Sequence, residues 1–252
     1  MPKRVVPEER RRRRRPTRSG LVLSETLIVE AALRLLREHG SAGLTARRLG
    51  LVLDCDPSTL YRYFRGMDEL TLAIGDALIG RAMHGWRPAG QWQDDLRAVG
   101  LRIHTAYLSH PQAAVLTASR VSGRGCELAA DEAVLDVLRT AGFPLPEAVR
   151  VYHAFIDTTL AFAALDAATL ALPSAARRAD EDMWQSTYAR LPATTHPRLA
   201  EAAPLLATRM VTSAYPTALD MLLTSAGSSL TASSAPSSPS GPPDDGAVGG
   251  RP

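Results

Sequence analysis

The apolar positions of the chain recur at helical spacing from about residue 22 to residue 225. Residues 25–39 are a clear case, because their apolar side chains fall on one face of a helix. Ser24 stands at the position of an N-cap, and Gly40 follows where a glycine ends many helices. The pattern predicts a helix over 25–39 whose inner face carries Ile28, Ala31, Ala32, Leu35 and Leu36.

Two shorter helices are predicted next. Thr45 is an N-cap type, and a short helix is expected from it to about Val52. Asp56 and Pro57 combine a natural N-cap with a residue whose φ is already set for the first helical position. A second short helix is therefore expected over 57–63.

The rest of the chain predicts longer helices. Ala and Leu, which favour helix, are abundant, and β-branched runs bounded by turn residues are scarce, so we expect an all-α protein. Pro216 lies inside the last helix and should kink or split it. The expected helices cover 69–83, 92–108, 111–120, 130–141, 146–171, 178–188 and 199–222.

The two ends of the chain differ from the middle in composition. Residues 1–20 contain nine basic and two acidic residues, including six arginines over 10–15, although the whole chain has a net charge of only +3. Such a basic arm favours a polyanionic partner, nucleic acid before membrane. Residues 226–252 are rich in Ser, Pro, Gly and Ala and cannot build a core. Both ends are predicted to be disordered, and the folded part to divide into 21–83 and 84–225.

Composition also argues against several classes of protein. Cys55 and Cys126 are too few for a disulfide scaffold and lack the spacing of a metal site, which fits a reducing cytoplasm. No signal peptide is expected. The longest apolar region, about 158–172, contains Asp166 and falls short of the roughly 20 residues that span a bilayer. We expect a cytoplasmic protein with no metal, no cofactor and no membrane contact.

The two short helices joined by a tight turn, over about 45–64, have the outline of a helix-turn-helix DNA-binding motif. In the second helix Leu60 and Phe64 are the strong core anchors, so its polar side chains are free to face outward. Hydroxyls and a guanidinium can donate to phosphates and base edges. The same spacing also fits a short amphipathic core helix. The outward-facing residues are Ser58, Thr59, Tyr61, Arg62 and Tyr63.

The stretch GLTARRLGLVLDCDPSTLYRYFRGMDEL, residues 43–70, closely resembles the DNA-binding domain of the TetR family of bacterial regulators. The resemblance is strong over about residues 22–82 and further on rests only on length and helical character. It implies a three-helix N-terminal domain followed by a larger helical ligand-binding and dimerisation domain. It also implies a role for each of several residues: Thr45 and Arg47 contact the DNA backbone or flanking bases, Ser58, Thr59, Arg62 and Tyr63 face the major groove, Tyr61 contacts phosphate, and Pro57 lies at the groove-facing tip.

The chain departs from the family pattern at two places. Asp54 and Cys55 stand in the turn where relatives have a glycine and an apolar residue. Asp can adopt the left-handed conformation that such a turn needs, and Cys55 is expected to be buried as a small hydrophobe. Met67 stands where many relatives carry a phosphate-binding lysine, a role for which Arg65 is the nearby substitute.

The resemblance further implies a homodimer and a small organic effector. Apolar stripes on two helices are expected to pair with their copies across a two-fold axis and form a four-helix interface, although the same stripes also fit internal helices of a monomer. The stripe on the helix over 146–171 consists of Val149, Tyr152, Ile156, Thr159, Leu160 and Ala163. The stripe on the helix over 199–222 consists of Leu205, Leu206, Met210, Val211, Leu219 and Leu222. Polar and aromatic residues on otherwise apolar helices are the candidates for the effector pocket. They are Trp92, His104, Tyr107, Arg120, Tyr152, His153, Phe155, Asp157 and Phe162.

These features predict a ligand-responsive transcriptional regulator, by family expectation a repressor released from a palindromic operator in double-stranded DNA. Two alternatives stay open. An architectural DNA binder without a ligand would need far fewer residues than this chain has. An all-helical enzyme would need a catalytic set, and the chain has no GxSxG, HExxH, Gly-rich phosphate loop or paired Cys/His set. We expect no catalytic residues.

Overall fold

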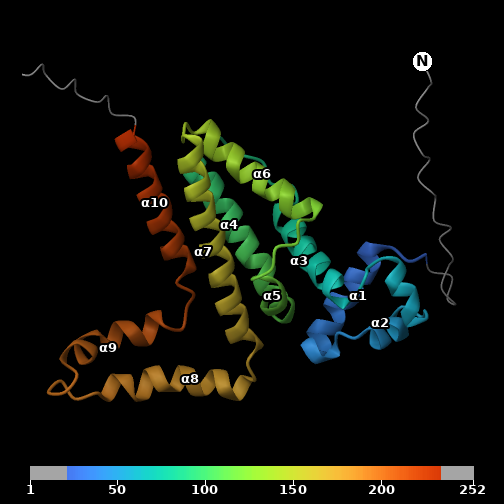
Figure 1. Ribbon diagram of the computed structural model, residues 1–252. Helices are drawn as coiled ribbons and strands as arrows, with labels where there is room; N and C mark the ends of the chain where they lie inside the picture. Colours follow the sequence, from blue (N-terminus) through green and yellow to red (C-terminus); the bar gives the residue numbers. More distant parts are fainter. Residues whose placement is uncertain (1–21, 234–252) are drawn as a thin grey trace, which may run out of the picture.

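The computed structural model describes residues 22–233, and this part of the chain is built from helices with no β-strand (Figure 1). The prediction of an all-α protein is confirmed. The predictions for the basic arm over 1–20 and for the tail beyond 233 lie outside the described residues.

The N-terminal lobe contains the short elements that the sequence predicts. They are α1 (Glu25–His39), the 3-10 turn η1 (Ser41–Gly43), α2 (Ala46–Val52) and the 3-10 helix η2 (Pro57–Arg62). Helix α1 has the predicted bounds. Ser24 Oγ accepts a hydrogen bond from the Leu27 N–H at 3.1 Å, and Gly40 adopts a φ of 66° at the other end. The predicted inner face of α1 is buried.

Helix α3 leads from this lobe into the body of the molecule. The body is formed by α3 (Met67–Met83), α4 (Trp92–Leu108), α5 (Pro111–Thr117), α6 (Gly125–Thr140), α7 (Leu145–Ala171) and α10 (Tyr215–Ser233). α7 packs along α4 and α5, α3 packs against α4 and α6, and α10 lies against α4 and α7 (Figure 1). One buried apolar cluster extends from the lobe through the body.

Several helix boundaries differ from the prediction by a few residues, and the earlier start of α6 has a clear local reason. α6 begins at Gly125 rather than at 130, because Asp76 Oδ1 accepts hydrogen bonds from the N–H groups of Cys126 and Glu127, both at 2.9 Å. These bonds satisfy backbone donors that the first turn of a helix leaves free.

The long helix expected over 199–222 is split, as the proline predicted. α9 (Pro197–Arg209) ends before Met210, and Pro216 lies in the first turn of α10. The tail prediction was wrong at its start, because α10 continues to Ser233 instead of ending near 225. Leu223 and Ala226 are buried in the core, so this Ser-rich segment gains enough apolar contact to remain helical.

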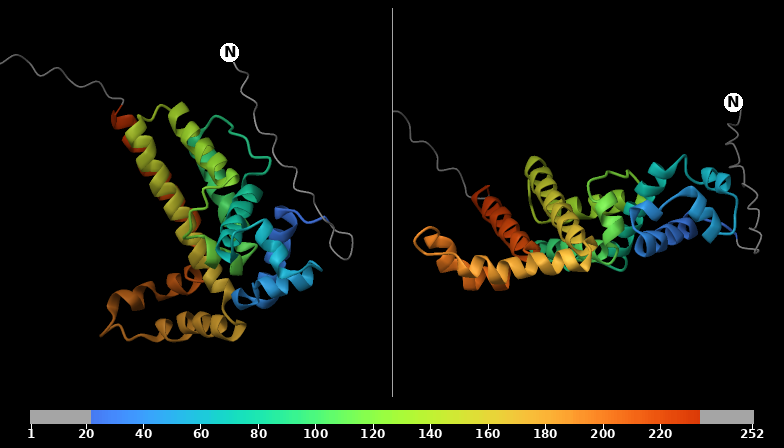
Figure 2. Two further views of the ribbon diagram at one scale, coloured as in Figure 1. Left: turned by 45° about the vertical axis from the view of Figure 1, so that its right-hand side comes forward. Right: turned by 90° about the horizontal axis from the view of Figure 1, so that it is seen from below.

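The remaining helices form an arm. α8 (Ser174–Ser186), the 3-10 turn η3 (Tyr188–Arg190) and α9 fold into a hairpin that extends away from the body (Figures 1 and 2). α8 has no buried residue, and Ala203 is the buried residue of α9. The Trp184 and Tyr188 rings stack with centroids 4.2 Å apart.

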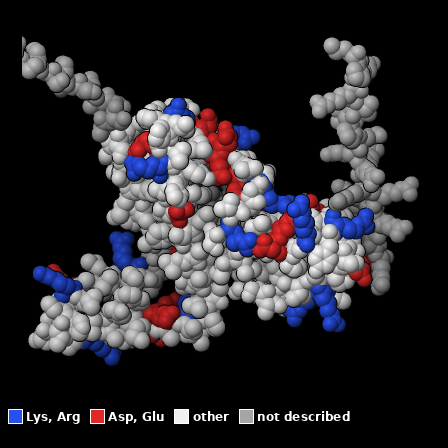
Figure 3. Space-filling view, in the orientation of Figure 1, with Lys and Arg blue, Asp and Glu red and all other residues white. Residues whose placement is uncertain are grey.

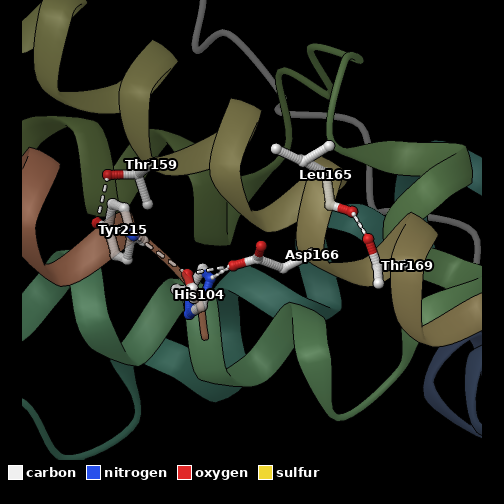
Figure 4. A network of polar contacts seen from close by, with 7 residues as sticks. His104, Thr159, Leu165, Asp166, Thr169 and Tyr215 are labelled. Carbon is white, nitrogen blue, oxygen red and sulfur yellow. Dashed lines mark hydrogen bonds and ion pairs between the residues drawn. The ribbon is translucent and has the colours of Figure 1, made fainter. Parts of the chain in front are cut away.

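A polar network joins α4, α7 and the start of α10 inside the body (Figure 4). His104 Nε2 lies 2.8 Å from Asp166 Oδ2, and Ser213 Oγ donates to the same carboxylate oxygen at 2.5 Å. The Tyr215 hydroxyl lies 2.8 Å from Thr159 Oγ1, and its ring stacks on His104 with centroids 4.6 Å apart. The buried polar atoms are thus paired, which fixes how α10 sits on the core.

Most of the stripe on α7 that was predicted to pair with a second copy faces inward instead, and Val149 is its exposed member; of the second stripe, Leu219 is buried in the protomer, whereas Leu205, Met210 and Val211 are exposed. Thr159 and Ala163 are buried within the protomer, and Tyr152, Ile156 and Leu160 point toward the interior of the body. α4 and α5 cover the side of α7 that the sequence assigned to a partner, because α7 is central in the body. The exposed apolar side chains of α7 are Leu145, Val149, Leu165 and Leu170.

α7 is, by length and composition alone, long and apolar enough to cross a membrane. One side of α7 packs against α4, α5 and α10, and 22% of its apolar window is buried in the described part of the chain.

Candidate functional site

The turn between α2 and η2 gives the N-terminal motif its geometry. Asp54 adopts a φ of 51°, the left-handed conformation expected of it. Asp56 then caps η2, with Oδ1 accepting a hydrogen bond from the Ser58 N–H at 2.8 Å, and Pro57 is the first residue of the helix. The predicted cap and turn are confirmed, although η2 is a 3-10 helix rather than an α-helix.

Gly50 allows the turn to lie directly on α2, a role that the sequence reasoning missed. A Cβ at this position would be 2.8 Å from the Cys55 carbonyl oxygen and 3.1 Å from a Pro57 ring carbon. The Cys55 N–H in turn donates to the Gly50 carbonyl at 2.9 Å. The crossing of the two helices of the motif therefore depends on the absence of a side chain at 50.

Most of the predicted DNA contacts are accessible on this lobe. Leu60 and Phe64 are buried and anchor η2, as expected. Thr45 Oγ1 accepts a hydrogen bond from the Arg48 N–H at 3.2 Å and so caps α2. The exposed predicted contacts are Thr45, Arg47, Ser58, Tyr61 and Arg62, and Pro57 and Thr59 are half-buried.

Tyr63 is placed differently from the prediction. Its ring is half-buried against the core, and its hydroxyl donates a hydrogen bond to the Leu23 carbonyl at 2.9 Å. This hydrogen bond links the segment before α1 to the end of η2, and the Tyr63 hydroxyl donates to it rather than facing outward toward a base.

The residues that depart from the family pattern differ in how far they are buried. Cys55 is half-buried against the core, and burial raises the pKa of its thiol, as expected of a small apolar residue. Met67 also packs against the core, whereas Arg65 is exposed.

The body contains a cavity of about 490 Å³ enclosed by α3, α4, α6, α7 and the segment that joins α5 to α6. This volume lies within the range of sites that bind small organic molecules. Apolar side chains from three helices form much of its wall: Leu72, Ile79, Ile103, Ile156 and Leu160. The Tyr107 ring is buried beside them, and burial raises the pKa of its hydroxyl to about 12, so that group is neutral at physiological pH.

Four of the nine predicted pocket candidates line this cavity. They are Tyr107, Arg120, Tyr152 and Asp157. Successive residues of a helix point 100° apart, so candidates that are close in sequence on α7 separate to different faces. Phe155 is fully buried in the core, whereas His153 is exposed and pairs with Asp157 at 3.1 Å.

The other candidates are elsewhere in the body. His104 belongs to the network with Asp166. Phe162 packs at an angle on Tyr215, with centroids 5.7 Å apart. Trp92 meets Phe143 edge to face and borders a separate cavity of about 240 Å³.

The sequence reasoning missed the acidic part of the cavity wall. Asp76, Glu127 and Asp131 all line the cavity. Glu127 and Asp131 are four residues apart on α6, a spacing that places them on one helix face and was a readable signal. Asp76 comes from α3 and meets them only through tertiary packing.

The segment between α5 and α6 connects the cavity to the N-terminal lobe. Residues 118–122 line the cavity. Arg120 in this segment forms an ion pair with Asp68 in the first turn of α3, at 2.9 Å. Arg124 forms an ion pair with Glu25 in the first turn of α1, at 2.6 Å, and lies 3.9 Å from Glu69.

Comparisons with known proteins agree with this architecture. The model for "Bacterial regulatory proteins, tetR family" matches residues 28–74, and that for "Tetracyclin repressor-like, C-terminal domain" matches residues 85–226. A solved structure of a possible TetR family transcriptional regulator from Streptomyces coelicolor is 26% identical, with a TM-score of 0.68, covering 82% of this chain and all of that one.

Two curated relatives match about half of the chain. An HTH-type transcriptional regulator of Saccharopolyspora erythraea is 30% identical over 127 residues, 50% of this chain and 54% of the relative. The tetracycline repressor protein class E of Escherichia coli is 31% identical over 137 residues, 53% of this chain and 64% of the relative. The matched part of the chain thus spans 54% and 64% of the length of these two curated relatives.

The C-terminal family model alone covers more than half of the chain, and the N-terminal one covers α1, α2 and η2. The chain belongs to the TetR family of bacterial regulatory proteins.

Proposed function

We propose that this chain is a DNA-binding transcriptional repressor of the cytoplasm, which acts as a homodimer and loses affinity for its operator when a small organic molecule enters the cavity. The observation that carries the proposal is the pairing of a helix-turn-helix with a 490 Å³ cavity whose wall includes the segment that holds the motif's lobe. The two alternative functions are an enzyme and a DNA-binding protein without a ligand.

In this proposal η2 enters the major groove with its first turn. Ser58, Thr59 and Arg62 are the base-reading candidates, and Tyr61 and Arg47 contact phosphate. Arg reads guanine edges with two hydrogen bonds, whereas contacts to phosphate carry no sequence information directly. Tyr63 has a supporting role, because its hydroxyl is bonded to the Leu23 carbonyl.

The homodimer would use the outer faces of α7 and α10. Both helices leave large apolar side chains uncovered on the protomer: Val149 and Leu165 on α7 and Met221 on α10. Covering such side chains with a second copy removes apolar surface from water, and two recognition helices then reach a palindromic operator from one side of the duplex.

The switch would act through the segment between α5 and α6. A molecule that displaces residues 118–122 also moves Arg120 and its neighbour Arg124, which are paired to the first turns of α3 and α1. An effector can change operator affinity only by its difference in affinity for the two arrangements, typically about 1 to 3 kcal/mol.

The polar network of the body does not favour the enzyme alternative. His104 Nε2 and Ser213 Oγ both bond to the same oxygen of Asp166. A hydrolase triad requires the histidine to lie between the serine and the carboxylate, accepting the serine proton. This cluster has a different order and is the structural link between α4, α7 and α10.

The proposal is tested by selecting duplexes from a random DNA library with the full-length protein. We expect enrichment of a palindrome whose half-sites are about 34 to 36 Å apart, or a multiple of that distance. Sedimentation of the protein–DNA complex should show an even number of protomers. Recovery of sequences without a common site would contradict specific recognition, whatever the cavity binds.

A further inference from the structure

The wall of the cavity carries more negative than positive side chains. Four carboxylates line it, from Asp76, Glu127, Asp131 and Asp157, against the single guanidinium of Arg120. Arg120 is exposed and is paired with Asp68, outside the cavity, at 2.9 Å. The charge of Arg120 is therefore paired with Asp68 and does not neutralise the four carboxylates of the cavity wall.

Two of these carboxylates also serve the fold. Asp76 accepts two hydrogen bonds from the backbone at the start of α6. Glu127 Oε2 accepts from the N–H groups of Ser122 and Gly123, at 2.7 and 2.9 Å. Their presence is explained by helix and loop capping, and their charge remains on the cavity wall.

Asp131 has a different environment. It is half-buried on α6, and it lines the cavity together with Tyr152 of α7. The charged neighbour that acts on it is another carboxylate, Glu127. Burial raises the pKa of the Asp131 carboxyl and Glu127 raises it further, while the nearby Tyr152 hydroxyl acts in the opposite direction. A cation in the cavity would relieve this cost.

The rest of the wall suits an organic cation rather than a metal ion. Tyr152 and the buried Tyr107 offer aromatic surface beside the carboxylates, and rings of this kind attract cations through their faces. Within residues 22–233 no group of three His, Cys, Asp or Glu side chains is arranged to hold a metal ion. Charge, aromatic surface and apolar wall together define one chemical class of ligand.

We propose that the cavity selects an amphipathic organic cation, with its charged group beside Asp131 and its apolar part against Ile103, Ile156 and Leu160. The class of ligand can be measured on the protein without DNA. Only the effect of that ligand on operator binding rests on the proposed function. Figure 3 shows acidic side chains gathered over α6 on the face in view, which would favour the approach of a cation.

The test compares two probes of nearly equal shape and opposite charge, tetraphenylphosphonium and tetraphenylborate, by calorimetry on the full-length protein. We expect one tetraphenylphosphonium per protomer and much weaker binding of the borate. Asp131→Asn, which removes the charge and keeps the shape of the side chain, should weaken phosphonium binding about 10-fold or more, the loss expected for one charge-assisted contact. Glu132→Gln is the matched control, because Glu132 is exposed and adjacent on α6 and does not line the cavity.

Several results would overturn the cation assignment. Equal binding of the borate, or phosphonium binding that Asp131→Asn leaves unchanged, would show that charge does not select the ligand. Failure of both probes to bind would also refute it. The function proposed above fails separately, if phosphonium binds as expected and the affinity for the selected operator does not change.

Discussion

Arg124, in the segment before α6, forms an ion pair with Glu25 in the first turn of α1, with 2.6 Å between Nη2 and Oε2. Arg120 makes the corresponding pair with Asp68 of α3. Both guanidiniums come from the segment between α5 and α6, part of which lines the cavity, and both carboxylates lie in the first turns of α1 and α3, the helices before and after the DNA-binding motif. The cavity and the motif are thus joined by side chains as well as by the course of α3.

The double variant Arg120→Gln with Arg124→Gln should keep its fold and lose much of its response to effector. Partly exposed ion pairs contribute about 0 to 1 kcal/mol each, so unfolding should change little. The ratio of operator affinities without and with effector should fall about 5-fold, measured by fluorescence anisotropy. Arg150→Gln, which removes an exposed pair with Glu147 on α7, is the control. An unchanged ratio would exclude this route of coupling.

Arg62→Ala should show whether Arg62 recognises bases or only contacts phosphate. On the selected operator it should lose about 1 to 3 kcal/mol of binding free energy, and less on random DNA. Arg47→Ala should weaken both by similar factors, because a phosphate contact is the same on every sequence. Equal losses from Arg62→Ala on the two DNAs would remove Arg62 from the base-reading set.

Gly50→Ala should disable DNA binding through the fold of the motif. The added methyl group would sit 2.8 Å from the Cys55 carbonyl oxygen, so the turn must move, at a cost of about 1 to 3 kcal/mol. We expect operator affinity to fall more than about 10-fold while circular dichroism changes little. Gly125→Ala at the start of α6 meets open space and serves as control. Normal operator binding by the Gly50 variant would show that the motif tolerates a wider turn.

Asp131→Asn should stabilise the protein without ligand at neutral pH. The folded-state pKa of Asp131 is raised, so the folded protein binds the proton more tightly than the unfolded chain does. The contribution of the Asp131 carboxyl to the free energy of unfolding is therefore fully present below the pKa of the unfolded chain, where the carboxyl is protonated. This contribution is lost as the pH rises through the pKa of the folded protein. The melting temperature should therefore rise by about 1 to 2 °C at pH 7, with a smaller gain at pH 4. A fall at pH 7 would mean that the carboxylate is favourably paired.

Deletion of residues 1–18 should reduce the salt dependence of DNA binding. The deleted segment carries nine basic residues, and each phosphate that they neutralise contributes roughly 0.9 to the slope of log affinity against log salt concentration. The slope is obtained from anisotropy titrations at several salt concentrations. If the slope is the same as that of the full chain, the arm does not contact DNA.

The sequence by itself determined the local structure of the DNA-binding lobe. Ser24, Thr45 and Asp56 cap the helices at which they were expected, and Asp54 adopts the left-handed conformation of the turn. Caps and turns depend on residues within a few positions of each other, so their chemistry can be read along the chain. The apolar period likewise gave the bounds of α1, α4 and α7 to within one residue.

Only the tertiary structure decided which face of each body helix meets the cavity, the core or the solvent. Tyr152 lines the cavity while Phe155, one turn further along α7, is buried in the core, and both belong to the same apolar period. Asp76 and Asp131 share a wall although 54 intervening residues separate them along the chain. An amphipathic pattern shows that a helix has an inner side; it carries no information on which other helices cover that side, since those contacts come from distant parts of the chain.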